Sequence, residues 1–146
     1  MNWRPRVLGD FLAERVPHAE ALVAPAHRFS YKDLLAKSKL AAGAMQALGI
    51  GKGDRVAILM PNGEQWLSLF YGAALIGAVT VPVNTRFKAA EIDYCLKQSG
   101  AKALFYVSRF LNIDFGKMVE EIDVQMAIDV SAEFPAGKFE DKKVKV

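Results

Sequence analysis

The sequence has little of the chemistry that marks an active site. Its 146 residues contain one cysteine, Cys95, and two histidines, His18 and His27. One cysteine excludes an internal disulfide and favours a reducing compartment, so we expect a cytoplasmic protein. Cys95 lies in a helical pattern without an obvious base beside it, which favours a small buried side chain over a nucleophile. The histidines lack metal-ligand spacing, so we expect surface side chains and no metal site.

Known catalytic motifs are also missing. The sequence has no G-x-S-x-G elbow, no H-E-x-x-H pair and no G-x-x-x-x-G-K-[ST] phosphate loop. The glycines at 49, 51 and 53 lack the dinucleotide spacing and precede a strand pattern, so they predict a turn. By itself, therefore, the chain shows no nucleophile, no paired general base and no phosphate-binding loop, and we assign it no catalytic residue.

Most of the chain has no excess of positive or negative charge. The formal net charge is +3, but the segment from Lys138 onward holds four lysines against Glu140 and Asp141. Residues 1–137 therefore carry 15 basic and 14 acidic side chains. No basic stripe with interleaved aromatic residues is present, so we expect no nucleic-acid partner. With 52% hydrophobic and 24% charged residues, the composition is that of an ordinary globular protein.

A long uncharged run raises the alternative of a membrane span. Gln65–Thr85 holds no charged residue and is long enough to cross a bilayer. Gly72, Gly77 and Pro82 interrupt it, and β-branched residues dominate after Gly77, as in a helix followed by a buried strand. The N-terminus lacks the apolar stretch and small-residue cleavage site of a signal peptide. We therefore expect neither a membrane span nor a signal peptide.

The first third of the chain predicts two helices and a small antiparallel pair. Apolar residues at helical spacing predict a short helix over Val7–Val16. A Pro-Ala-His turn between two apolar segments predicts the antiparallel pair near residues 20–29. Ser30 and Asp33 have the spacing of a capping box, so a helix with one apolar stripe should begin there. Gly49 should end it, where a left-handed residue is needed.

From there the pattern alternates between strands and helices. Arg55–Met60 is a nearly continuous apolar run, typical of a strand covered on both faces. Asn62 is placed as the N-cap of a helix over Gly63–Gly77 that is apolar on most of its circumference, and Val79–Val83 predicts the second strand. Such a helix should be buried against more protein than one small sheet provides.

The remaining segments continue this order. We predict a helix at Lys88–Gln98, a strand at Ala103–Val107, a helix at Phe110–Val119 and a strand at Gln125–Val130. The fold class is therefore α/β, a layered parallel sheet with flanking helices over residues 1–130. The polar residues 131–146 should be a linker or a frayed terminus.

In such sheets, ligands bind beyond the carboxyl ends of the strands. Arg86 and Arg109 each follow a predicted strand, and a guanidinium can grip a phosphate or carboxylate bidentately. The alternative is that each arginine is a solvated loop residue or pairs with a nearby acid. The acidic residues Glu120, Glu121 and Asp123 come at the end of a predicted helix, which favours a solvated cluster. The other polar side chains at these strand ends are Asn62, Asn84, Thr85, Ser108, Asp129 and Ser131.

Four ordered motifs stand out in the first 84 residues. They are Phe29-Ser30-Tyr31-Lys32-Asp33-Leu34, Gly51-Lys52-Gly53-Asp54-Arg55-Val56-Ala57, Met60-Pro61-Asn62 and Gly77-Ala78-Val79-Thr80-Val81-Pro82-Val83-Asn84. In order and spacing they resemble the opening of the adenylate-forming enzymes, more narrowly of their acyl-CoA synthetase branch. The resemblance covers roughly residues 7–130, and the first motif and the segment Leu75–Asn84 match the two earliest core motifs of that superfamily.

The resemblance implies a two-step reaction with ATP, Mg²⁺ and CoA. A carboxylic acid would attack the α-phosphate of ATP to form an acyl-adenylate and pyrophosphate, and the CoA thiol would then take the acyl group as a thioester. The family's Ser/Thr/Gly-rich phosphate loop, its ribose-binding Asp and its C-terminal catalytic Lys have no matching position here. The chain should therefore be an N-terminal fragment, inactive alone, with the rest of the synthetase as its partner.

One residue could be carried over from the family. Asn84-Thr85-Arg86-Phe87 resembles the segment from which some CoA ligases direct an Arg at the CoA nucleotide phosphates. The acyl substrate stays open between aromatic, medium-chain and long-chain acids. The alternative is a natural short protein that uses the same fold as a binding or assembly module. In either case, exposed apolar surface predicts self-association of the isolated chain.

Overall fold

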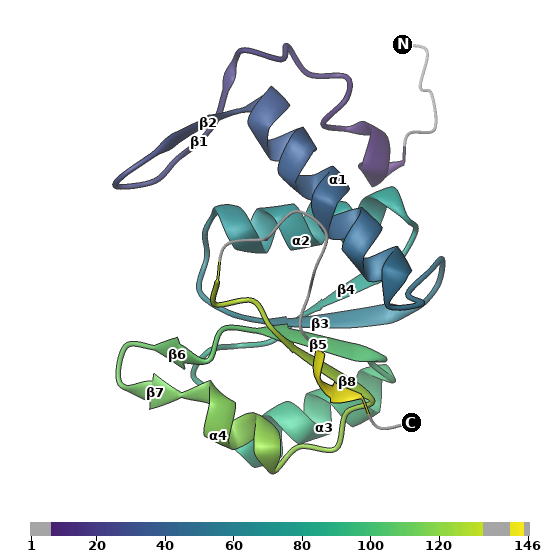
Figure 1. The fold of residues 1–146 in the computed structure, drawn as a ribbon, viewed down its shortest axis with the longest axis vertical. Helices are drawn as coiled ribbons and strands as arrows, with labels where there is room; N and C mark the ends of the chain where they lie inside the picture. Colours follow the sequence, from purple (N-terminus) through teal and green to yellow (C-terminus); the bar gives the residue numbers. More distant parts are fainter. Residues whose placement is uncertain (1–6, 133–140, 145–146) are drawn as a thin grey trace.

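The structure is a computed structural model that describes residues 7–132 and 141–144 (Figure 1). Its centre is a five-stranded sheet with the order β4-β3-β5-β8-β9. The pairs β3–β4, β3–β5 and β5–β8 are parallel, as the alternation predicts, whereas β9 runs antiparallel to β8. The strands are β3 (Arg55–Leu59), β4 (Val79–Pro82), β5 (Ala103–Tyr106), β8 (Met126–Asp129) and β9 (Asp141–Val144).

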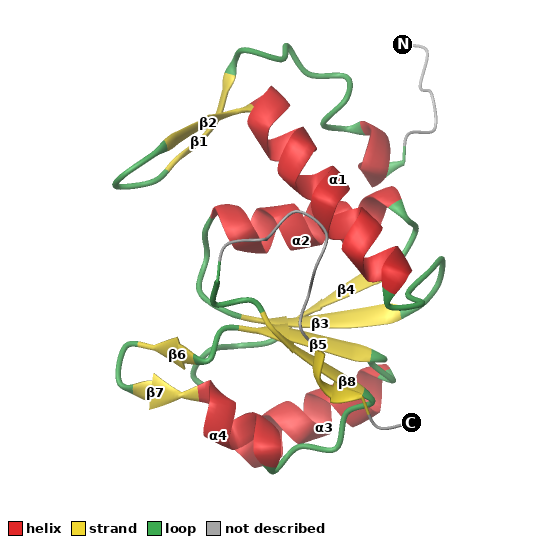
Figure 2. Cartoon of the chain, in the orientation of Figure 1, coloured by secondary structure: helices red, strands yellow, loops and turns green. Residues whose placement is uncertain are grey.

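Helices cover both faces of this sheet (Figure 2). On one face lie α1 (Tyr31–Ala47) and α2 (Glu64–Leu75), and on the other α3 (Ala89–Ser99) and α4 (Phe115–Glu120). Because successive strand residues point to opposite faces, β3 and β5 supply both layers of the core. Residues Val56, Ile58 and Phe105 pack toward α1 and α2, and Ala57, Leu59 and Leu104 toward α3 and α4. This two-sided burial explains the continuous apolar runs of the central strands.

The capping box at the start of α1 is confirmed. The Asp33 backbone N–H donates to Ser30 Oγ at 3.2 Å, and the Ser30 N–H donates to Asp33 Oδ2 at 2.9 Å. The hydrogen bonds with Ser30 hold the pKa of the Asp33 carboxyl below its ordinary value. At the other end, Gly49 has a φ of 75°, the left-handed geometry expected of the residue that ends this helix.

The uncharged run divides into α2 and β4, as predicted. Within the described residues, no helix has the length and apolar character needed to cross a membrane. The predicted N-cap is wrong, because Gly63 takes that position with an extended φ of 169° and no side-chain cap. Asn62 is therefore left outside the helix. The α2 aromatic residues Trp66, Phe70 and Tyr71 are half-buried and in contact: Trp66 stacks on Phe70 with ring centroids 5.4 Å apart, and Phe70 meets Tyr71 edge-on at 5.1 Å.

Of the two elements predicted before Ser30, the antiparallel pair is present and the first helix is not. The antiparallel pair forms as β1 (Glu20–Val23) and β2 (Arg28–Ser30). The predicted helix over Val7–Val16 is wrong, since only the 3₁₀ turn η1 (Leu8–Asp10) and further turns are present. Leu12 is buried, but Val7 and Val16 are 65% and 71% exposed, so the apolar stripe gains little burial to offset the cost of helix nucleation.

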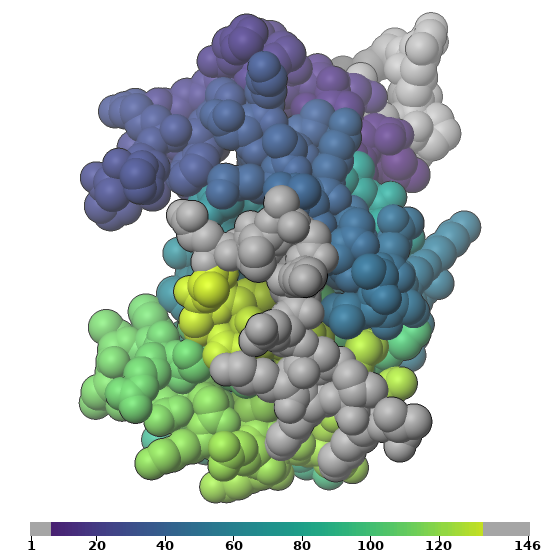
Figure 3. All heavy atoms as spheres, in the orientation of Figure 1, coloured from purple at the N-terminus to yellow at the C-terminus, as the bar shows by residue number. Residues whose placement is uncertain are grey.

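The predicted helix over Phe110–Val119 is also wrong in its first half. A hairpin of β6 (Arg109–Phe110) and β7 (Ile113–Asp114) stands there, and α4 begins at Phe115. Asp114 Oδ1 caps α4 by accepting the Lys117 N–H at 3.0 Å. Leu111 makes the hairpin turn with a φ of 53°. The β1–β2 and β6–β7 hairpins appear as separate projections on one side of the molecule (Figure 3).

The predicted polar terminus, residues 131–146, differs from the structure at β9, whose four residues pair with β8. Residues 133–140 and 145–146 of this prediction lie outside the described residues.

Candidate functional site

A cleft of about 750 Å³ lies beyond the carboxyl ends of β3 and β4. Three segments line it, which are residues 60–62 with Trp66, residues 82–86, and residues 110–113 of the β6–β7 hairpin. We call it the strand-end cleft. Its position is that expected of a ligand site in a parallel α/β sheet, because the carboxyl ends of the strands meet at one edge. In Figure 1, the start of α2 and the β6–β7 hairpin lie at this same edge.

Arg86 lines the strand-end cleft and is exposed. Its backbone is held in place, since the Arg86 N–H donates to Asn84 Oδ1 at 2.9 Å. An Asn side chain that bonds the backbone two residues on makes an Asx turn, which fixes the chain direction after β4. The Arg86 guanidinium forms no hydrogen bond or ion pair with any residue that the structure describes, so its five donors remain available to a ligand.

The other predicted arginine has a different environment. Arg109 lies on β6 with its side chain 80% exposed, and its guanidinium nitrogen is 3.4 Å from Asp114 Oδ2. It does not line the strand-end cleft, although its neighbours Phe110 and Leu111 do. Of the two arginines, only Arg86 reaches the cleft without a partner among the described residues.

The remaining polar strand ends divide between the cleft and a separate cluster. Asn62, Asn84 and Thr85 line the strand-end cleft, so the structure brings them together with Arg86. Ser108 and Ser131 instead contact each other, with their Oγ atoms 2.8 Å apart, at the ends of β5 and β8. These two hydroxyls join the two strand ends and face each other instead of the cleft's arginine.

Sequence reasoning missed Trp66 and the hairpin wall of the cleft. Trp66 follows the helical pattern of α2, which predicts a core residue. The hairpin was hidden because Phe110–Val119 fits a helical apolar pattern. Asp114 was the available signal, since an Asp just before Phe115 is a good N-cap and would have moved the start of the helix there.

The residues expected to lack a chemical role lie away from the cleft. His18 and His27 are exposed, and Cys95 is half-buried on α3 with a free thiol. Among the described residues, no three or more His, Cys, Asp or Glu side chains are placed to hold a metal ion. Glu120 and Glu121 are exposed at the end of α4, as a solvated acidic cluster would be.

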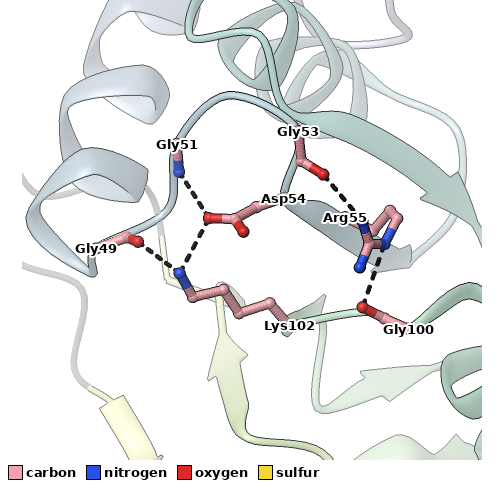
Figure 4. Close-up of polar contacts among 7 residues, drawn as sticks. All are labelled: Gly49, Gly51, Gly53, Asp54, Arg55, Gly100 and Lys102. Atoms are coloured by element: carbon pink, nitrogen blue, oxygen red, sulfur yellow. Dashed lines mark hydrogen bonds and ion pairs between the residues drawn. The ribbon is translucent and has the colours of Figure 1, made fainter.

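The glycine-rich turn lies at the opposite, amino edge of the sheet (Figure 4). Asp54 Oδ2 accepts the Gly51 N–H and a Lys102 Nζ donor, both at 2.9 Å, and Lys102 also donates to the Gly49 carbonyl at 2.7 Å. The Gly51 N–H, followed by Lys102, lowers the pKa of the Asp54 carboxyl. These bonds tie Asp54 and Lys102 to the backbone of the turn and so close it before β3.

Together, the sheet order and the polar cleft at the strand ends define an α/β ligand-binding domain. The AMP-binding enzyme family matches residues 11–145. The chain therefore belongs to this family of adenylate-forming enzymes.

Curated relatives place the chain within one branch of the family. It is 47% identical over 104 residues to the long-chain-fatty-acid–CoA ligase FadD13 of Mycobacterium tuberculosis, covering 68% of this chain and 21% of that protein. It is 37% identical over 112 residues to the putative acyl-CoA synthetase YngI of Bacillus subtilis, covering 75% and 20%. The chain thus spans about a fifth of the length of the curated relatives that it matches.

Solved structures share the fold. The N-terminal domain of FACL13 from Mycobacterium tuberculosis superposes with a TM-score of 0.72 at 36% identity, over 91% of this chain and 32% of that one. An O-succinylbenzoate coenzyme A synthetase from Bacillus subtilis, in complex with AMP, superposes with a TM-score of 0.72 at 26% identity, over 94% and 35%. The predicted resemblance to the N-terminal part of acyl-CoA synthetases is confirmed.

Proposed function

We propose that this chain is the N-terminal part of an ATP-dependent acyl-CoA synthetase and contributes to its CoA site. The intact enzyme would join a carboxylate oxygen to the α-phosphorus of ATP with release of pyrophosphate. The CoA sulfur would then attack the acyl carbonyl with release of AMP. The family match and the acyl-CoA ligase relatives support the reaction class, and the single cysteine favours a cytoplasmic location.

The observation that carries the site assignment is the free guanidinium of Arg86 in the strand-end cleft. An exposed, unpaired guanidinium is well suited to bind phosphate, because two of its N–H groups can donate to two phosphate oxygens at once. The cleft also offers apolar surface from Trp66 and the hairpin. A phosphate joined to a flat, partly apolar group, such as the nucleotide portion of CoA, suits that combination. We therefore assign Arg86 to a CoA phosphate.

The described residues fit a phosphate group better than a metal ion. They present no cluster of three metal-ligating side chains, so no step is assigned to Mg²⁺ in this part of the enzyme. The sequence also lacks the phosphate loop and the catalytic lysine that the first reaction step needs. The chain alone should therefore release no pyrophosphate from ATP, Mg²⁺ and a panel of carboxylic acids. Turnover in that assay would disprove the proposed inactivity.

The test of Arg86 uses the intact synthetase encoded by the full reading frame. Arg86→Ala should raise the KM for CoA by about 10-fold, because hydrogen bonds to a charged group contribute roughly 1.5–3 kcal/mol and solvent weakens this exposed one. Pyrophosphate exchange, which reports the first step, should be unchanged. Arg109→Ala is the matched control and should alter neither quantity. An unchanged KM for CoA in Arg86→Ala would remove Arg86 from the site.

The second candidate is a short protein that uses the same fold as a binding or assembly module. The half-buried aromatic series on α2 favours it, since such surface suits a protein partner. The encoding reading frame distinguishes the two functions. Continuation into a Ser/Thr/Gly-rich loop supports the synthetase, whereas a stop after Val146 supports the module.

A further inference from the structure

The hairpin wall of the strand-end cleft is anchored by a chain of hydroxyl groups. Ser108, which leads from β5 into the hairpin, donates its N–H to Ser131 Oγ at 2.8 Å. Ser131 Oγ in turn donates to Asp129 Oδ1, which also accepts the Ser131 N–H at 2.9 Å. Because a carboxylate can only accept, the Ser131 proton points to Asp129, and the Ser108 hydroxyl must donate to Ser131. The direction of every bond in this chain is therefore fixed.

The opposite wall, at the start of α2, is tied to the same segment. Gln65 Nε2 donates to the Val130 carbonyl, and the next residue, Trp66, lines the strand-end cleft. The Val130 N–H donates to the Tyr106 carbonyl at 2.8 Å and extends the β5–β8 ladder past the end of β8. Asp129, Val130 and Ser131 thus contact both walls of the cleft, and the Val130–Tyr106 hydrogen bond fixes them to the end of the central sheet.

We propose that Asp129, Val130 and Ser131 form a brace that sets the distance between the two walls of the strand-end cleft. Gln65 and Ser131 are its positioning residues, and neither is needed for chemistry. The predicted effect of the brace on CoA binding rests on the proposed function. Its predicted effect on the hairpin depends only on the hydrogen bonds described above.

The hairpin packs Phe110 and Ile113 against the core, and the brace adds the polar anchor at its base. Each of its strands has two residues, and an isolated hairpin of that size is marginal in water. Its Arg109–Asp114 ion pair is exposed, and such pairs contribute little to stability. The Gly116 N–H donates to the Ser108 carbonyl at 3.1 Å, so Ser108 links the hairpin base to both α4 and the brace.

The test compares hydroxyl variants of the intact synthetase by amide hydrogen exchange, read by mass spectrometry on fragments of the hairpin, and by the KM for CoA. Ser131→Ala should speed exchange at the Ser108 amide about threefold to tenfold, because it removes one acceptor. It should weaken CoA binding by a similar factor. Ser131→Thr keeps the Oγ and should restore both values.

Ser99→Ala is the matched control. It removes another hydroxyl hydrogen bond, 3.2 Å to the Leu96 carbonyl, at the far edge of the sheet. Ser99→Ala should leave the exchange rates of the hairpin amides and CoA binding unchanged, although it also removes one hydroxyl hydrogen bond.

Each outcome decides the proposal. Unchanged exchange at the Ser108 amide in Ser131→Ala would overturn the brace, whatever happens to CoA. Faster exchange with unchanged CoA affinity would show that the brace does not position the site, and would also overturn it. If Arg86→Ala leaves the KM for CoA of the same enzyme unchanged, the ligand assignment in the proposed function fails, while the exchange data still decide whether Ser131 holds the hairpin.

Discussion

Gly72 of α2 packs directly against α1. A Cβ built on Gly72 would lie 2.8 Å from Ala41 Cβ, 3.0 Å from the Ser38 carbonyl oxygen and 3.1 Å from the Ala42 nitrogen. Two of these three neighbours are backbone atoms, which cannot move unless the whole helix moves. Gly72→Ala must therefore push α1 away from α2 and loosen the core between them.

The size of the effect is the difference between two opposing contributions. Overpacking a core position costs about 1–3 kcal/mol, whereas Ala in place of Gly inside a helix returns about 0.8–1 kcal/mol. Gly72→Ala should thus lower the free energy of unfolding by up to about 2 kcal/mol. For a chain of this size, that corresponds to a fall in Tm of up to about 7 °C.

Gly43 on α1 provides the matched control, since it is exposed and an added Cβ would meet no atom within 4 Å. Gly43→Ala should stabilise by about 0.8–1 kcal/mol from helix propensity alone. Urea unfolding followed by far-UV circular dichroism measures both variants. The same substitution should change stability in opposite directions in two helices that touch. If Gly72→Ala stabilises the chain as Gly43→Ala does, the close packing of α1 on α2 is wrong.

Three further predictions follow from single features. The pKa of Asp54 lies below its ordinary value of 3.8, so its ionised form stabilises the fold above about pH 4, and this contribution is lost as the pH falls through the folded pKa. Urea unfolding across that range should show a smaller loss for Asp54→Asn than for the wild type, and equal losses would contradict the assignment. Leu111→Gly should leave stability unchanged or raise it by up to about 1 kcal/mol, because a left-handed φ strains leucine. Leu40→Gly inside α1 is the control and should destabilise by about 1 kcal/mol. Thermal unfolding measures both variants, and a loss of stability in Leu111→Gly would refute the strain. The isolated chain should self-associate through apolar surface that includes Val79, 51% exposed on the edge strand β4, and a single monomeric species in sedimentation velocity would disprove this.

The candidate site shows how far sequence reasoning reaches. The rule that ligands bind beyond the carboxyl ends of parallel strands was enough to select Arg86 and the asparagines near it. The sequence also favoured Arg86 over Arg109, because only Arg86 lies in a segment that resembles the family's CoA-phosphate contact; the structure adds that Asp114 pairs with Arg109. Sequence reasoning could not reveal Trp66 as a cleft residue, since a helical pattern does not show which face is left open.

The sequence alone determined those parts of the fold that depend on neighbouring residues. The Ser30–Asp33 capping box, the left-handed Gly49 and the apolar run of β3 each depend on residues a few positions apart, so their patterns predicted them correctly. The family motifs belong to the same local segments. They identified the adenylate-forming family before any coordinates were known.

The tertiary structure decided what depends on distant partners. Whether Val7–Val16 forms a helix depended on how much of its apolar stripe the core could bury, and of that stripe only Leu12 is buried. Residues 109–114 form a hairpin that packs Phe110 and Ile113 against the core, a contact that the helical pattern of the sequence does not show. The strand order β4-β3-β5-β8 brought Asn62, Arg86 and the hairpin around one cleft. Such contacts join residues that are far apart in sequence, and no local pattern records them, because their free energy exists only once the sheet has formed.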